Sequence, residues 1–202
     1  MSRTQVKTRR QGPEIRQACY SDHTAIRDFL GGLSLRARYL RFFTGAIGPS
    51  PSMLRILAGG RDHIDAMVAV ENGEIIGHAM ASDAAGPGGT VTEIGVVVTD
   101  ACQGQGVGSA LVRTLTARAQ ARGIATLTME VLAENRQVLA MITDHWPAAQ
   151  HDLSGAYATI RVPLPQPGAE RGNSAREPKA VKAPGSERES GGLPRERLAI
   201  RY

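Results

Sequence analysis

The spacing of hydrophobic residues changes several times between Glu14 and Val162, and each change marks a new element. Alternating apolar positions are typical of half-buried strands, and spacings of three and four residues are typical of helices. Asn72-Gly73 separates two alternating runs and predicts a tight hairpin. The predicted elements are a strand (14–18), a helix (22–30), a second helix (34–44), a short third helix from Ser50, three strands (66–70, 74–82 and 91–99), a helix to Arg122, a strand (125–132), a helix (135–146) and a strand (156–162).

Polar residues at the predicted helix starts support these boundaries. Asp22, Ser34 and Ser50 each precede a helical pattern, and such side chains cap the first free N–H groups of a helix. Gly123 follows the helix predicted to end at Arg122, at the position where a glycine commonly terminates a helix. The order of strands and helices predicts an α+β, or mixed α/β, domain.

The two ends of the chain differ in composition from the middle. Residues 1–13 carry four basic residues and no acidic one, which predicts a flexible basic N-terminus without a secretory signal. Residues 163–202 are rich in Pro, Gly, Ser, Glu and Arg, a composition typical of a disordered tail. The segment 14–162 holds twelve basic and fourteen acidic residues, so the formal charge of +5 belongs to the ends. The predicted domain is therefore not a strongly basic nucleic-acid binder.

The remaining composition suggests a cytoplasmic protein without metal. Cys19 and Cys102 are the only cysteines, which predicts neither a disulfide framework nor a zinc site. The histidines show no metal-binding spacing. No long uncharged apolar run predicts a membrane span.

The segment 96–112, VVVTDACQGQGVGSALV, joins a predicted strand to a predicted helix through a glycine-rich turn. The first N–H groups of a helix have no partner, and the helix dipole favours an anion there. Gly104, Gly106 and Gly108 leave those groups uncovered, which predicts a phosphate or pyrophosphate. No Lys follows as in a P-loop, and Ser109 stands at the last position of the dinucleotide pattern GxGxxG. A tight turn without a ligand is the alternative.

The run Gln103-Gly104-Gln105-Gly106-Val107-Gly108 resembles the Gln/Arg-x-x-Gly-x-Gly/Ala motif of the GNAT superfamily of acyl-CoA N-acyltransferases. The resemblance extends over residues 14–162. Three stretches, LSLRARYLRFF, EIGVVVTDACQGQGVGS and VLAENRQVLAMI, are similar to bacterial protein lysine acetyltransferases that act on acyl-CoA synthetases. The resemblance implies a central mixed, mostly antiparallel sheet, splayed at the coenzyme site and flanked by helices.

The resemblance also implies acetyl-CoA as the co-substrate and assigns residues to it. The N–H groups from Gly104 to Ser109 would hold the pyrophosphate, and Val96 and Val98 would offer backbone groups to the pantetheine arm. Asn135 matches an Asn that contacts the arm in the family, and a helix N-cap is the equal alternative. The predicted coenzyme-binding residues are Val96, Val97, Val98, Gln103, Gly104, Gln105, Gly106, Val107, Gly108, Ser109 and Asn135.

Glu93 is the predicted catalytic residue. It interrupts an otherwise apolar strand, where an unpaired charge is costly. An attacking amine must lose a proton, and the resemblance implies that a Glu at this position is the general base. The alternative is a solvent-facing strand residue, and Glu130 is a weaker substitute for the base.

The sequence departs from the family at the general acid. Ile142 stands where many members have a Tyr that protonates the leaving thiolate, and His145 lies about one turn further along. An ordinary thiol has a pKa of ~8.5, so the thiolate needs little help and catalysis is compatible with this loss.

The predicted function is the transfer of an acetyl group from acetyl-CoA to an amine, with a protein lysine as the acceptor and an acyl-CoA synthetase as a candidate partner. A small-molecule amine or amino acid, and a catalytically weak acetyl-CoA-binding regulatory module, are the alternatives. The segment 34–44 carries three arginines among aromatic residues. Either it binds an acidic acceptor, or it is an amphipathic helix with its aromatics inward and its arginines outward.

Overall fold

The computed structural model describes residues 12–43, 49–86 and 89–165. The predicted basic N-terminus and the predicted disordered tail lie almost wholly outside the described residues. The helices are α1 (His23–Gly32), α2 (Leu35–Phe42), α3 (Pro51–Leu57), α4 (Val107–Ala121) and α5 (Arg136–His145). The strands are β1 (Glu14–Gln17), β2 (Ile64–Glu71), β3 (Glu74–Gly86), β4 (Gly89–Val98), β5 (Thr126–Leu132), β6 (Gln150–Ser154) and β7 (Tyr157–Pro163).

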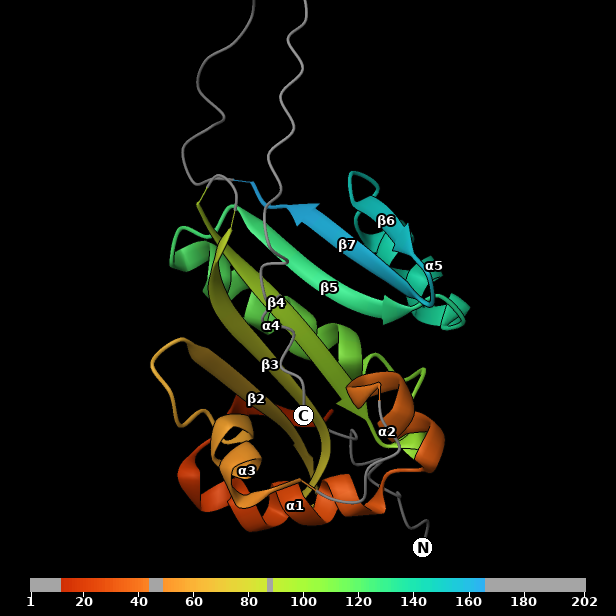
Figure 1. Cartoon of the computed structure of the whole chain (residues 1–202). Helices are drawn as coiled ribbons and strands as arrows, with labels where there is room; N and C mark the ends of the chain where they lie inside the picture. The colour runs from red at the N-terminus through yellow and green to blue at the C-terminus, as the bar shows by residue number, and fades with distance from the viewer. Residues whose placement is uncertain (1–11, 44–48, 87–88, 166–202) are drawn as a thin grey trace, which may run out of the picture. The chain divides into compact units, whose positions relative to one another are not determined.

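The strands form one sheet in the order β1-β2-β3-β4-β5-β7-β6 (Figure 1). All neighbours pair antiparallel except β4 and β5, which are parallel. This confirms the predicted mixed, mostly antiparallel sheet in an α+β fold. No helix in the described part of the chain is long and apolar enough to cross a membrane.

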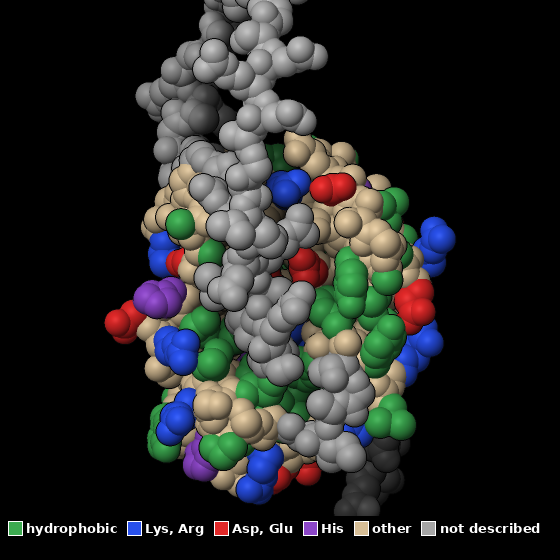
Figure 2. Space-filling model, viewed as in Figure 1, with side chains coloured by type: hydrophobic (Ala, Val, Ile, Leu, Met, Phe, Trp, Pro, Cys, Tyr) green, Lys and Arg blue, Asp and Glu red, His purple; other side chains and the backbone are tan. Residues whose placement is uncertain are grey.

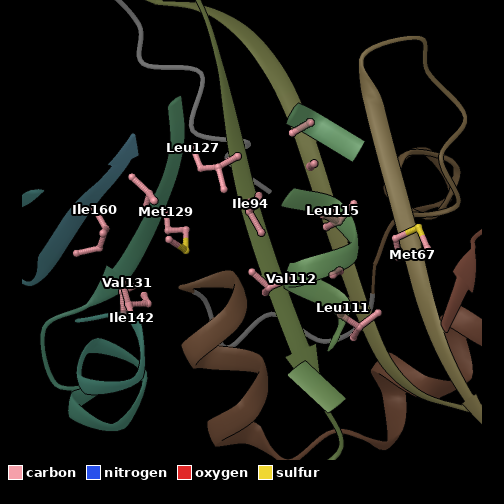
Figure 3. Close-up of a cluster of buried hydrophobic side chains, with 14 of the residues drawn as sticks. Met67, Ile94, Leu111, Val112, Leu115, Leu127, Met129, Val131, Ile142 and Ile160 are labelled. Atoms are coloured by element: carbon pink, nitrogen blue, oxygen red, sulfur yellow. The ribbon is translucent and has the colours of Figure 1, made fainter. Parts of the chain in front are cut away.

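Helix α4 packs against one face of the sheet through its predicted apolar stripe. Leu111 and Leu115 have no exposed surface, and Ile94 of β4 belongs to the same buried cluster (Figure 3). Because successive strand residues point to opposite faces, Glu93 and Gly95 point away from α4. That opposite face is where α2 contacts β4.

Most of the predicted local signals are confirmed. Ser34 and Ser50 accept hydrogen bonds from the first turns of α2 and α3. Asn72 and Gly73 have φ angles of 52° and 83°, as a tight two-residue hairpin requires. Asp22 is an exception, because its carboxylate makes no cap bond to α1 and instead accepts hydrogen bonds from the Cys19 N–H, at 2.9 Å, and from the Arg16 guanidinium, at 2.8 Å. This ion pair, a direct charged hydrogen bond, holds the pKa of Asp22 well below its usual range.

Several element predictions were incomplete. Strand β3 runs to Gly86, four residues past its predicted end at Ser82. Helix α1 continues to Gly32, two residues past the predicted end, so its two glycines weaken the helical pattern but do not stop it at Leu30. Strand β6 was missed because all five of its residues are exposed, so it has no apolar alternation. Its partner β7 does alternate and was found.

A charged network fixes the C-terminal end of α4 to β2 and β3. Asp65, only 7 % exposed, accepts hydrogen bonds from Arg118 Nε at 2.6 Å and from Arg122 Nη1 at 3.1 Å. Arg122 also donates to Asp83 at 3.3 Å. Two carboxylates, Asp65 on β2 and Asp83 on β3, therefore hold the end of α4 to this hairpin.

We expect Asp65→Asn to lower the free energy of unfolding by ~1–3 kcal/mol. Arg118 and Arg122 would lose their ionised acceptor, and the NH2 group of the new buried amide cannot accept a hydrogen bond from either guanidinium. The control is Asp28→Asn, which removes a pair with Arg27 that is exposed on both sides. That change should cost under ~1 kcal/mol. Urea unfolding of both variants measures this, and equal losses would contradict a structural role for the Asp65 network.

His78 of β3 is a buried histidine held neutral by its surroundings. It is 1 % exposed, and its Nε2–H donates to the Leu57 carbonyl oxygen at 2.8 Å. Burial, which disfavours the charged imidazolium, lowers the pKa of His78 to about 4. In the unfolded chain the same group takes up a proton near its ordinary pKa of ~6.5.

The free energy of unfolding should therefore fall as the pH drops from ~6.5 towards 4, by up to ~3 kcal/mol, because the unfolded state binds the proton first. Below that window the effect levels off. In His78→Gln the amide can still donate to Leu57 but does not titrate. Urea unfolding at pH 7 and pH 4.5 should show a smaller pH difference for this variant, and an unchanged difference would remove His78 from the acid response.

Candidate active site

The sheet opens between its two parallel strands. The β4–β5 ladder consists of three residue pairs, from Val91↔Thr126 to Glu93↔Thr128. Beyond that point β4 continues to Val98 and β5 to Leu132, and the two strands diverge (Figure 1). The splay that the resemblance implied is therefore present, and Glu93 stands at its apex.

The divergence leaves one edge of β4 facing the gap. The Thr99 N–H donates to the Ile76 carbonyl oxygen at 2.9 Å, and bonded pairs alternate along an antiparallel ladder. Val97, two residues away, consequently bonds with its register partner His78 on β3. The backbone groups of Val96 and Val98 point the other way, towards the gap, where an extended ligand can pair with them.

The glycine turn follows directly. Gly104 and Gly106 have φ angles of 72° and 82°, the left-handed region that side chains disfavour. Gly106 is the N-cap of α4 and has no side chain to satisfy the first helical N–H groups. A fifteen-residue helix thus begins with uncovered donors, which is a suitable place for an anion.

Two side chains of the turn bond within the chain. Gln103 Nε2 donates to the Val98 carbonyl oxygen at 3.2 Å, and Gln105 Nε2 donates to the Ala101 carbonyl oxygen at 2.8 Å. Val107 is 4 % exposed and belongs to the core. These side chains stabilise the turn. Any contact of Gln105 and Val107 with the ligand is therefore expected to involve their backbone groups.

The Glu93 carboxylate is half-buried at the apex of the splay. Burial, followed by the charge of Glu130, raises the pKa of Glu93 above its ordinary value, and the charge of Arg41 opposes this rise. A carboxylate with a raised pKa holds a proton more strongly, which is the property a general base needs near neutral pH.

Arg41 of α2 lines the site, and the segment 34–44 was predicted only as a possible binder of an acidic acceptor, without a place beside β4. A Cβ added at Gly95 would lie 2.5 Å from Arg41 Cζ, so the guanidinium lies against the β4 backbone. The amphipathic alternative for this helix holds only in part. Arg36 is exposed as it expects, but Arg38 and Arg41 are half-buried and Tyr39 is 41 % exposed. The signal was Gly95 itself, since a glycine inside a strand often marks a close approach.

A hydrogen-bonded link joins α2 to the glycine turn. The Ser34 hydroxyl donates to Asp100 Oδ1 at 3.0 Å and also accepts from the Ala37 N–H at 3.1 Å. Asp100 begins the 3₁₀ turn that leads into the glycines. The helix that carries Arg41 is therefore fixed relative to the predicted anion site.

A cavity of about 690 Å³ connects these features. It is bordered by α2, the diverging ends of β4 and β5, the glycine turn and α5. Gln105 and Val107 are not in its lining, but all the other predicted site residues are: Glu93, Val96, Val97, Val98, Gln103, Gly104, Gly106, Gly108, Ser109 and Asn135.

The sequence profile described as the Acetyltransferase (GNAT) family matches residues 34–144, more than half of the chain. The chain belongs to the GNAT family. It is an acetyl-CoA-dependent N-acetyltransferase, as predicted.

Solved structures share the fold of this GNAT acetyltransferase. The GNAT domain of S. lividans PAT is 24 % identical, with a TM-score of 0.68 over 75 % of this chain and 90 % of that chain. The ribosomal-protein-alanine N-acetyltransferase from Brucella melitensis is 18 % identical, with a TM-score of 0.61 over 75 % and 99 %. The protein yncA from Salmonella typhimurium, solved with acetyl-CoA, is 18 % identical, with a TM-score of 0.59 over 79 % and 98 %.

Asn135 of this GNAT acetyltransferase caps α5. Its Oδ1 accepts a hydrogen bond from the Val138 N–H at 3.4 Å, so the capping alternative is confirmed. Because Asn135 also lines the cavity, a contact to the coenzyme is compatible with the cap and stays a prediction.

The position of the usual Tyr is occupied by a core residue. Ile142 is 2 % exposed and packs in the main hydrophobic cluster. One turn further along, His145 lines the cavity. Within the described ranges, no three His, Cys, Asp or Glu side chains form a group that would hold a metal ion.

Proposed function

We propose that this enzyme acetylates the side-chain amine of a protein lysine, with Glu93 as the general base. The observation that carries the proposal is the place of Glu93, a half-buried carboxylate at the apex of the β4–β5 splay and in the wall of the cavity. A carboxylate there can reach an acceptor amine that approaches the end of a ligand held along β4.

The residues of the cavity fit acetyl-CoA, which supplies an activated thioester when bound. The backbone groups of Val96 and Val98 would pair with the amide-bearing pantetheine arm. The N–H groups from Gly104 to Ser109 would hold the pyrophosphate at the positive end of α4. Both contacts use backbone atoms, which explains why glycine and valine suffice at these positions.

Glu93 then acts on the acceptor. A lysine reaches the site as an ammonium ion, and Glu93 takes the proton that the nitrogen must lose. The neutral nitrogen forms a bond to the acetyl carbon while the carbon–sulfur bond breaks, and the sulfur leaves with the electron pair as a thiolate. The nitrogen loses a second proton as the amide forms, and the thiolate takes up a proton to give the thiol, so the proton on Glu93 is the one released to solvent. Overall, one amine and one thioester give one amide and one free thiol.

Two features favour a lysine acceptor. The carboxylates of Glu93 and Glu130 both line the cavity and attract a cation. The wall also contains apolar side chains, among them Leu40, Phe43 and Met129, which suit the aliphatic stem of lysine. The three sequence stretches similar to lysine acetyltransferases make an acyl-CoA synthetase the first protein acceptor to test.

A small amine that also carries a carboxylate is the second candidate acceptor. The observation that favours it is Arg41, a guanidinium in the wall of the same cavity. Such a group binds carboxylates well.

A thiol-release assay with acetyl-CoA distinguishes the candidates. The panel contains an acyl-CoA synthetase, lysine peptides, free amino acids and simple amines, and mass spectrometry locates the acetyl group. We expect release with a lysine side chain. Release with amino acids alone would favour the second candidate, and tight acetyl-CoA binding without release for any amine would indicate a regulatory binding module.

A further inference from the structure

Three charged side chains from three elements line the cavity on the same face of the sheet. Arg41 comes from α2, Glu93 from β4 and Glu130 from β5. Glu93 pairs in register with Thr128, and Glu130 is two residues further along β5. Side chains two residues apart on a strand share a face, so Glu130 and Glu93 lie on the same face of the sheet.

Arg41 approaches Glu93 along the β4 backbone. Its guanidinium covers Gly95, which shares a face with Glu93 two residues away. In the described part of the chain no carboxylate lies within ion-pair distance of Arg41, and its Nε is buried without a hydrogen-bond partner. The Arg41 charge therefore acts on Glu93 through space and leaves both carboxylate oxygens free for an acceptor.

A half-buried arginine whose Nε lacks a hydrogen-bond partner is costly unless its charge has a use. Ser34, which caps α2 and bonds to Asp100, sets the position of the helix, and Gly95 leaves room for the guanidinium. The Arg41 guanidinium carbon also lies over the Phe42 ring, 5.0 Å from its centroid. The place of the Arg41 charge is thus fixed by packing.

The two neighbours of Glu93 act on it in opposite senses. The negative charge of Glu130 favours the protonated form of Glu93, and the positive charge of Arg41 favours the ionised form. A base must be ionised before the reaction and must hold the proton afterwards, so its affinity for the proton has to be balanced.

We propose that Arg41 and Glu130 are positioning residues of Glu93 that set, in opposite directions, the pH range in which this base accepts the proton of the acceptor. The inference rests on the proposed role of Glu93. It adds a task for α2, whose contribution to the reaction is a fixed positive charge.

Other charged groups face the same cavity, and their places differ. They are Arg36, Asp100, Glu134, Arg136 and His145. Asp100 is engaged by Ser34, and the buried His78 lies on the Arg41 side of the sheet, where burial and then the Arg41 charge keep it neutral. Arg41 and Glu130 are the charged groups that shift Glu93.

The test is the pH dependence of kcat/KM for wild type, Arg41→Gln, Arg41→Lys and Glu130→Gln, measured by thiol release. Arg41→Gln should move the acid limb to higher pH, so that activity at pH 6 relative to pH 9 falls roughly threefold or more. Glu130→Gln should move the limb to lower pH and raise that ratio. Arg41→Lys, which keeps the charge but not the planar contact with Gly95, should stay near wild type.

A second readout does not depend on turnover. Carbon-13 NMR titration of the Glu93 side-chain carboxyl should show the same opposite displacements in Arg41→Gln and Glu130→Gln. The acid limb could disappear in Glu93→Gln but keep its position in both Arg41→Gln and Glu130→Gln. That result would support Glu93 as the base and would overturn the inference about its two neighbours. If the limb persists in Glu93→Gln, the proposed role of Glu93 is what fails, and unshifted NMR titrations would overturn the inference independently.

Discussion

Glu93→Gln should lower kcat by ~10²–10⁴-fold with little change in acetyl-CoA affinity, because the amide is nearly isosteric but does not accept the ammonium proton. Glu93 lies at the apex of the splay, and its pKa is raised chiefly by burial. Activity should return in part at high pH, where more of the acceptor amine is already neutral. Steady-state kinetics and calorimetric titration of acetyl-CoA measure the two quantities.

The matched control for this substitution is Glu74→Gln, which makes the same chemical change at an exposed hairpin position outside the cavity. Its kcat should equal that of the wild type. If Glu93→Gln had the same kcat as the wild type at pH 7, Glu93 would not be the base, and Glu130 would be the next residue to substitute.

Gly106→Glu should weaken acetyl-CoA binding by ~10²-fold or more. It places a carboxylate at the N-cap of α4, where the pyrophosphate would bind, and juxtaposed like charges cost several kcal/mol. No atom lies within 4 Å of a Cβ added at Gly106, so the fold should survive. Calorimetric titration gives the affinity, and thermal unfolding confirms that the domain remains folded.

A second variant separates charge from backbone strain. Gly106→Gln shares the unfavourable φ of 82°, which costs ~1–2 kcal/mol for a residue with a side chain, but adds no charge. It should lose the same stability as Gly106→Glu and much less affinity. Equal losses of affinity would assign the effect to turn conformation, and unchanged affinity in both would remove the glycine turn from the coenzyme site.

The sequence predicted those parts of the fold that depend on interactions between residues close together in the chain. The apolar stripe of α4, the serine caps of α2 and α3 and the Asn72-Gly73 turn each depend on residues within one element. Strand β6 carries no such signal, because it is exposed along its whole length and is held by its ladder with β7. An edge strand of this kind forms because of its backbone pairing with the neighbouring strand, which its own sequence does not reveal.

The site was predictable where backbone chemistry specifies it and less so where side chains from distant elements meet. The glycine turn and the interrupting charge of Glu93 stand out in the sequence. The role of Arg41 depends on α2 crossing β4 at Gly95, which helical periodicity does not encode. The same holds for Asp65, whose two arginine partners lie over fifty residues away.

The most direct test of the account is the mass of a lysine peptide, with its N-terminus blocked, after incubation with acetyl-CoA and either wild type or Glu93→Gln. The wild-type enzyme should add one acetyl group to the lysine side chain and release an equal amount of thiol. Glu93→Gln, which should still bind acetyl-CoA, should give neither product above the uncatalysed level at pH 7. Equal acetylation by both enzymes, or none by a wild-type enzyme that binds acetyl-CoA, would contradict a lysine acetyltransferase that uses Glu93 as its base.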